Sequence, residues 1–248
     1  MSNIGRKKGF LVFLVLLMAL VCMVFIGAEL FQIKKVTVFG NEKLVYNDII
    51  KLSGIDYGCN IFKVDKQLVE KRLESNPYIE VISILPNYPD ELIINIRERK
   101  PAAIIPYLGS YIIIDDHGII LEIQKELEEF QYPIIRDLRV KSFVIGRELV
   151  VENSYQLKVL YRLLEGIDEE GIQDQISEII LKDTEDIFLI SKSGMKIRMG
   201  QAVDVHNKLR WLTVDEFAEM EDTIKNGILD VSVASKPVIK LVETEVDS

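Results

Sequence analysis

The chain has 248 residues and a formal net charge of −9, with 39 acidic and 30 basic side chains. All the acidic residues follow residue 28, together with 27 basic ones (30 minus 3), so this larger part carries a charge of −12. Such an excess of negative charge argues against nucleic acid and anionic lipid surfaces as partners. Cys59 is the one cysteine after residue 28, which excludes an intrachain disulfide there and leaves core packing to stabilise the fold.

The first predicted element is an uncharged apolar helix over residues 10–28. At about 1.5 Å per residue, its 19 residues match the roughly 30 Å hydrocarbon core of a bilayer. A buried core helix and a cleaved signal peptide are the alternatives, but a core helix normally keeps a polar stripe, and a signal peptide has a shorter apolar run. Residues 26–29 also form a weak cleavage site. We therefore predict an uncleaved transmembrane helix.

The basic residues near the N-terminus predict the orientation of this helix. Arg6, Lys7 and Lys8 precede the apolar run, and basic residues favour the cytoplasmic side of a membrane. The tail over residues 1–9 is therefore predicted to be cytoplasmic and is too short to fold by itself. All that follows residue 28 is predicted to lie outside the cytoplasm, which makes the chain a single-pass protein of the cell membrane.

Residues 31–100 are predicted to form a small α+β unit in the order β-α-α-β-β. Apolar residues that alternate with polar ones indicate its strands, and Gly or Pro residues mark the ends of its helices. Asp65 is the expected N-cap of the second helix, with Val64 and Val69 in the positions of a hydrophobic staple. The expected elements are a strand around Val36 and Val38, helices over 46–53 and after Asp65, and strands over 78–85 and 91–98.

Residues 101–242 are predicted to form a mostly antiparallel β domain with short helices, followed by an acidic tail over 243–248. Hairpins are expected to turn at residues 116–118 and 192–194. A helix capped by Asn153 or Ser154 has an apolar face at i, i+3, i+4 and i+7. The further expected elements are a short helix that includes Val205, Leu209 and Leu212, and a pair of strands over 228–242.

Residues 115–117, Asp-Asp-His, are the strongest candidate for metal binding or acid–base catalysis. Three consecutive residues in a hairpin turn are expected to point their side chains apart, and Asp and Gly suit such a turn, so we interpret this triplet as structural. No nucleophile motif, metal-spaced His/Cys cluster or glycine-rich phosphate loop occurs, so we predict no catalytic, cofactor-binding or metal-binding residue. His206 is interpreted as a surface or capping residue. Trp211 is interpreted as a core or half-buried helix residue, with an interface anchor as the alternative.

Five segments resemble, in their order and spacing, the signatures of a known family: "FQIKKVTVFGN", "GIDYGCNIFKVD", "NPYIEVISILPNYPDELIINIRERKPAAI", "YIIIDDHGIILE" and "ILDVSV". On these segments the chain resembles the FtsQ/DivIB family of bacterial cell-division proteins, and residues 31–104 resemble a POTRA domain. The resemblance implies a non-enzymatic membrane scaffold of the divisome at the division septum, without a cofactor. It also implies binding of FtsL-like and FtsB/DivIC-like anchored coiled-coil proteins, and a role in controlling septal peptidoglycan synthesis.

The resemblance further implies that partners bind near the C-terminal strands by strand addition, which corresponds here to residues 228–242. An edge strand has unpaired backbone groups that an incoming strand satisfies. Val231 and Val233 alternate with Asp230 and Ser232, which predicts one core face and one solvent face, and Pro237 suits an edge. The alternative is a last core strand whose edge Lys236 and Pro237 protect. The candidate partner-binding residues are Asp230, Val231, Ser232, Val233 and Ile239.

Two other functions are kept as alternatives. POTRA units elsewhere handle passing polypeptides, so the chain is alternatively an exported single-POTRA chaperone or translocation module, although such proteins usually carry several copies. The third hypothesis is an exported hydrolase that acts on the cell wall. That hypothesis requires turnover that is lost when Asp115 or Asp116 is replaced.

Overall fold

The computed structural model describes residues 10–11, 13–19, 29–127, 132–213, 217 and 227–241. Residues 10–11 and 13–19 are helical, but none of the helices in the described ranges combines the length and apolarity needed to cross a bilayer. Residues 12 and 20–28 of the predicted span lie outside the described residues, as do the predicted tails. The span therefore stays a prediction.

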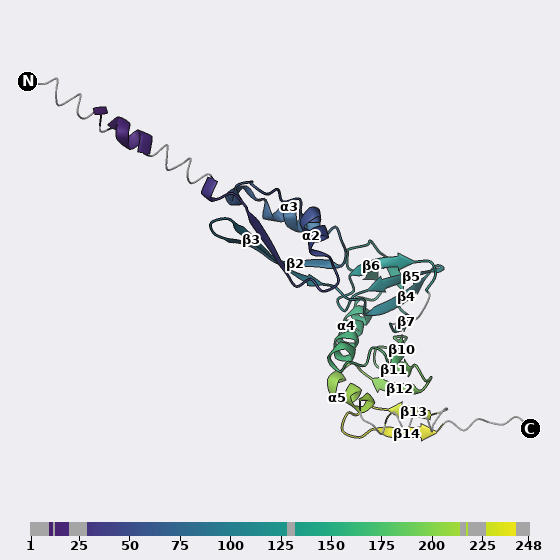
Figure 1. Ribbon diagram of the computed structural model, residues 1–248. Helices are drawn as coiled ribbons and strands as arrows, with labels where there is room; N and C mark the ends of the chain where they lie inside the picture. The colour runs from purple at the N-terminus through teal and green to yellow at the C-terminus, as the bar shows by residue number, and fades with distance from the viewer. Residues whose placement is uncertain are drawn as a thin grey trace, which may run out of the picture. The chain divides into compact units, whose positions relative to one another are not determined.

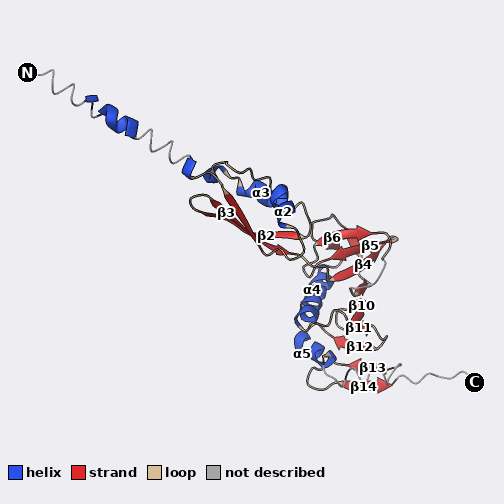
Figure 2. Cartoon of the chain, in the orientation of Figure 1, coloured by secondary structure: helices blue, strands red, loops and turns tan. Residues whose placement is uncertain are grey.

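The chain divides into two compact units, Met1–Glu98 and Arg99–Ser248. Each unit has its own cluster of buried apolar residues. The first unit combines helices with a small sheet, and the second is built mainly of strands (Figures 1 and 2). The fold class is therefore mixed α+β, as predicted.

The first unit has the predicted β-α-α-β-β order with one short extra turn of 3-10 helix. Its sheet has the strand order β1-β3-β2, in which β1 runs parallel to β3 and β2 runs antiparallel to it. Because β1 and β3 are far apart in sequence, this pairing closes the unit. The elements are β1 (Lys35–Phe39), α2 (Tyr46–Ser53), η1 (Ile61–Lys63), α3 (Lys66–Leu73), β2 (Ile79–Asn87) and β3 (Glu91–Glu98).

Local capping explains where the helices of this unit begin and end. The Asp65 side chain accepts a hydrogen bond from the backbone N–H of Leu68 at 3.1 Å, which confirms it as the N-cap of α3. Gly54 ends α2 in a left-handed conformation, with a φ of 63°. The helices then bury Ile49 and Leu73 in the same core as the inward residues of β3.

The second unit contains a nine-stranded sheet with the order β14-β13-β12-β11-β10-β7-β4-β5-β6, and a separate two-stranded ribbon, β8-β9. Three neighbouring pairs are parallel, β12–β13, β7–β10 and β4–β7, and the rest are antiparallel. The prediction of a mostly antiparallel sheet is thus confirmed. The strands are β4 (Ala103–Tyr107), β5 (Ser110–Ile114), β6 (Ile120–Gln124), β7 (Ile134–Arg136), β8 (Val140–Ser142), β9 (Val150–Val151), β10 (Ile176–Ile180), β11 (Ile187–Ser191), β12 (Lys196–Gly200), β13 (Gly227–Asp230) and β14 (Val238–Leu241).

The helices of the second unit are α4 (Ser154–Glu169), α5 (Val205–Leu209) and η2 (Arg210–Leu212). Asn153 caps α4, because its side chain accepts a hydrogen bond from the N–H of Tyr155 at 3.0 Å. Apolar residues of α4 and of the sheet belong to one core cluster, and Figure 2 shows α4 and α5 along one side of the strands. The α4 residues in that core include Leu157, Leu160, Leu163 and Leu164.

Candidate partner-binding site at the C-terminal strands

The strand at the end of the described sheet is β14, not β13. β13 lies between two neighbours: it pairs in parallel with β12, where Ile197 faces Leu229, and antiparallel with β14, where Leu229 faces Ile239. Within the described part of the chain, β14 has β13 as its one neighbour. Its outer side is therefore an edge of the sheet formed by the described residues, the kind of edge with which an added strand pairs.

The structure differs from the expected alternation over residues 230–233. Asp230 and Val231 are both buried, and Val233 is 59% exposed. The physical reason is that β13 ends at Asp230 and the chain then turns, so the alternation of a strand no longer applies. Ser232 is half-buried in this turn. Of the five residues predicted to bind a partner, Ile239 alone lies in β14, where it is 39% exposed.

Asp230 connects three strands through its carboxylate. The carboxylate accepts hydrogen bonds from Arg198 of β12 at 3.2 Å and from Lys240 of β14 at 2.9 Å. The other oxygen accepts from the N–H and the hydroxyl of Ser232, at 3.1 and 2.6 Å. Burial alone would raise the pKa of Asp230, but the bonds from Lys240, Ser232 and Arg198 outweigh burial and hold that pKa well below its usual range. Asp230 therefore holds the edge strand in place.

Trp211 fixes the loop that joins β13 to β14. Its indole N–H donates a hydrogen bond to the carbonyl oxygen of Ala234 at 2.7 Å, and the ring packs against the core of the second unit. Trp211 is half-buried, as predicted. It also lines an open hollow of about 440 Å³ beside this loop, together with Asp204, Asn207, Arg210, Thr213, Ala234 and Ser235.

Lys208 is a structural residue near the site that sequence reasoning missed. It is 4% exposed, and its ammonium donates hydrogen bonds to the carbonyl oxygens of Met199 and Gln201, both at 2.9 Å. Burial lowers the pKa of this ammonium, while the neighbouring Asp204 opposes that change. A lysine on a short amphipathic helix is ordinarily expected to be solvated, so no local signal could have predicted this role.

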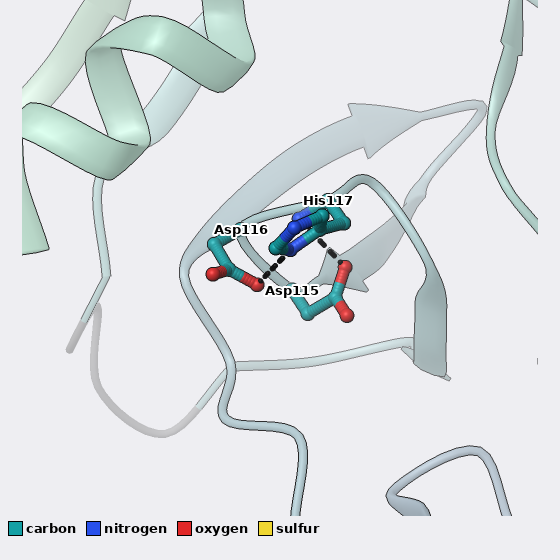
Figure 3. A group of neighbouring side chains, drawn as sticks. All are labelled: Asp115, Asp116 and His117. Carbon is teal, nitrogen blue, oxygen red and sulfur yellow. Dashed lines mark hydrogen bonds and ion pairs between the residues drawn. The ribbon is translucent and has the colours of Figure 1, made fainter. Parts of the chain in front are cut away.

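The triplet Asp115-Asp116-His117 lies in the turn between β5 and β6 (Figure 3). The expectation that its side chains diverge is wrong, because a ligand atom from each lies within 4.8 Å of the others. Asp115 is buried, and its carboxylate accepts hydrogen bonds from the backbone N–H groups of His117 at 3.0 Å and Ile119 at 2.7 Å, and from Arg99 at 2.9 Å. Asp115 thus holds the turn closed, and His117 contacts Asp116 beside it.

Cell division proteins of other organisms are similar to this chain along most of its length. The family described as POTRA domain, FtsQ-type, matches residues 31–99. The cell division protein FtsQ of Syntrophotalea carbinolica is 29% identical over 221 residues, which cover 87% of this chain and 76% of that protein. The cell division protein DivIB of Clostridium acetobutylicum is 28% identical over 213 residues, which cover 85% of this chain and 83% of that protein.

A solved structure is also similar to part of the chain. The major extracytoplasmic domain of DivIB from Geobacillus stearothermophilus is 14% identical and matches with a TM-score of 0.33. The match covers 51% of this chain and 96% of that one.

Proposed function

We propose, from the premise that this chain belongs to the FtsQ/DivIB family of bacterial cell-division proteins, that it is a non-enzymatic, single-pass membrane scaffold of the divisome. In this proposal the helix over 10–28 anchors the chain at the septum, and the two folded units lie outside the cytoplasm. The scaffold holds FtsL-like and FtsB/DivIC-like coiled-coil proteins and so helps to control septal peptidoglycan synthesis. The relatives described as cell division proteins support the cellular role.

The partner-binding part of the proposal rests on β14 as the end strand of the nine-stranded sheet. A four-residue strand held by its neighbour on one side presents its outer backbone groups in a fixed geometry, which lowers the entropy lost when a partner strand is added. The hydrogen bonds that Asp230 accepts from Arg198 and Lys240 support this rigidity, because they connect β14 to β13 and β12. Val238 and Ile239, which are 42% and 39% exposed, offer apolar contacts beside that backbone.

Proline substitutions in β14 test this docking mode. Successive residues of an antiparallel strand direct their N–H groups to opposite sides, so of Val238→Pro and Ile239→Pro one removes an outward N–H and the other an N–H toward β13. We expect the variant that loses an outward N–H to keep its melting temperature and to capture the partner pair roughly tenfold more weakly. That decrease corresponds to about 1.4 kcal/mol of binding free energy. The measurement is affinity capture by the purified full chain in detergent.

Ile123→Pro is the matched control, because β6 is the other end strand of the same described sheet and Ile123 is 37% exposed. Capture should be unaffected by this control. Unchanged capture by both β14 variants would contradict docking at that edge. A deletion that begins at residue 228 is a poorer test, because it also removes Leu229 and Val231 from the core.

A further inference from the structure

Three aromatic side chains form a continuous cluster at one end of the first unit. Phe31 precedes β1, Phe62 lies in η1, and Tyr88 lies in the turn between β2 and β3. The ring centroids of Phe31 and Phe62 are 5.0 Å apart, those of Phe62 and Tyr88 5.3 Å, and those of Phe31 and Tyr88 6.2 Å. We call these three rings the aromatic cluster. They bring together segments that are distant in sequence.

Two of the three rings face solvent to an extent that core packing does not explain, while Phe31 is half-buried and packs against the core of the first unit. Phe62 is 62% exposed and Tyr88 is 56% exposed, and the neighbouring Leu30 is 47% exposed. Burying such side chains stabilises a protein by about 1.5–3 kcal/mol each. Two exposed rings in contact, Phe62 and Tyr88, are therefore typical of an apolar surface that another apolar phase covers.

Backbone hydrogen bonds hold the aromatic cluster beside the point where the chain enters the unit. The N–H of Ile61 donates to the carbonyl oxygen of Phe31 at 2.9 Å, and the N–H of Lys34 donates to the carbonyl oxygen of Asp90 at 2.8 Å. These bonds connect η1 and the β2–β3 turn to the residues that precede β1. Figure 1 shows this turn at the end of the unit where the chain enters.

We propose that the aromatic cluster rests in the headgroup region of the bilayer that anchors the chain, an inference that depends on the membrane span proposed above. The predicted span ends at Ala28, three residues before Phe31. Three extended residues reach at most about 10 Å, and the headgroup layer is itself roughly 5–7 Å thick on each side. A span that ends at Ala28 thus brings Phe31 to the headgroup layer. Tyr and Trp are enriched at this depth of membrane proteins, and Tyr88 is the member of the aromatic cluster that belongs to this class.

The ion pairs of two basic side chains near the aromatic cluster, Lys34 and Lys35, favour apolar contact with the membrane over recognition of anionic headgroups. Lys34 pairs with Asp90 at 3.3 Å, and Lys35 pairs with Glu91 at 2.7 Å. These two basic side chains are therefore each paired with an acid of the same unit. A zwitterionic bilayer should accept the aromatic cluster as well as an anionic one does.

Tryptophan fluorescence in lipid vesicles tests the inference on the full chain. In a Trp211→Phe background, Phe62→Trp places the one tryptophan in the aromatic cluster and keeps an aromatic ring there. Phe39→Trp is the matched control, because Phe39 is 55% exposed and ends β1, at the opposite end of that strand. In phosphatidylcholine vesicles with brominated acyl chains, we expect the tryptophan at position 62 to lose emission and shift to the blue. The tryptophan at position 39 should do neither.

Flotation of the same vesicles in high salt measures whether the chain is anchored in the membrane, independently of the contact made by the aromatic cluster. A chain that floats with the vesicles while the position 62 tryptophan stays unquenched overturns the membrane contact and leaves the anchor intact. Equal quenching at positions 62 and 39 also overturns it, because the contact is then not specific to the aromatic cluster. A chain that does not float overturns both the contact and the proposed anchor.

Discussion

Gly40 lies directly after β1 with a φ of +90°, a backbone conformation that residues with a Cβ rarely adopt. A Cβ at this position would also overlap the carbonyl oxygen of Ile96, in the neighbouring strand β3. Two separate costs, backbone strain and a steric clash, therefore apply to any other residue. Gly58 has a similar φ of +85°, but no atom lies within 4 Å of a Cβ built there. A substitution at Gly58 would therefore cause backbone strain without a steric clash.

We expect Gly40→Ala to lower the free energy of opening of the first sheet by about 3 kcal/mol, and Gly58→Ala by about 1–2 kcal/mol. The difference between the two variants isolates the clash with the backbone of Ile96, because the strain in φ is common to both. Hydrogen exchange of the β1 and β3 amides in the full chain measures the opening energy. Equal effects of the two variants would show that the clash is relieved by a small backbone shift.

Among the elements, the strands β12, β13 and β14 are connected to one another through a single carboxylate, that of Asp230. Asp230 is buried, and it accepts hydrogen bonds from both neighbouring strands. A buried carboxylate with several donors is worth more than an exposed ion pair, because its donors also lose their partner when it is removed. The position of the proposed docking edge therefore depends on a residue that does not itself lie in β14.

Asp230→Asn should destabilise the C-terminal strands by about 1–2 kcal/mol. Because the pKa of Asp230 is lower in the folded chain than the unfolded value of about 3.9, the stabilisation is complete above that pH and is lost as the pH falls below it. We therefore expect Asp230→Asn to lower the melting temperature at neutral pH and to have a smaller effect near pH ~3. Asp174→Asn, at an exposed aspartate, should change little at either pH.

At the scale of the whole molecule, the proposal places both folded units outside the cytoplasm. Leu108 is suited to a topology test, because it is 89% exposed in the turn between β4 and β5. In a Cys22→Ser, Cys59→Ala background, we expect Leu108→Cys to react with a membrane-impermeant maleimide in intact spheroplasts. Ser2→Cys should react after lysis alone. Labelling of both sites from outside, or release of the chain into the medium, would contradict a single-pass anchor.

Local sequence signals predicted most of the elements. Asp65 and Gly54 mark helix ends through hydrogen bonds and backbone preferences that involve near neighbours in the chain. The apolar face of α4 follows from the helical period in the same way. Such features depend on a few consecutive residues, so they can be predicted from the sequence without knowledge of the tertiary structure.

The candidate site was predicted less well, because its residues depend on pairing between distant segments. The sequence suggested that residues 228–242 end the sheet, and the order of strands confirms that β14 ends the described sheet. It did not indicate that β13 is an inner strand, since its parallel partner residues in β12 lie 32 positions earlier, as Ile197 does from Leu229. Nor did it indicate that Asp230 is buried, because its donors Arg198 and Lys240 come from two other strands.

The sequence alone predicted the α+β class and the order of the elements, because periodicity, caps and turn residues act within short windows of the chain. Tertiary structure alone decided which strand is outermost, which charges are buried and which aromatic rings meet. Those outcomes depend on long-range pairings, such as β1 with β3 and β12 with β13, that no local pattern specifies. Burial then gives a residue such as Asp230 or Lys208 a role that its position in the sequence does not indicate.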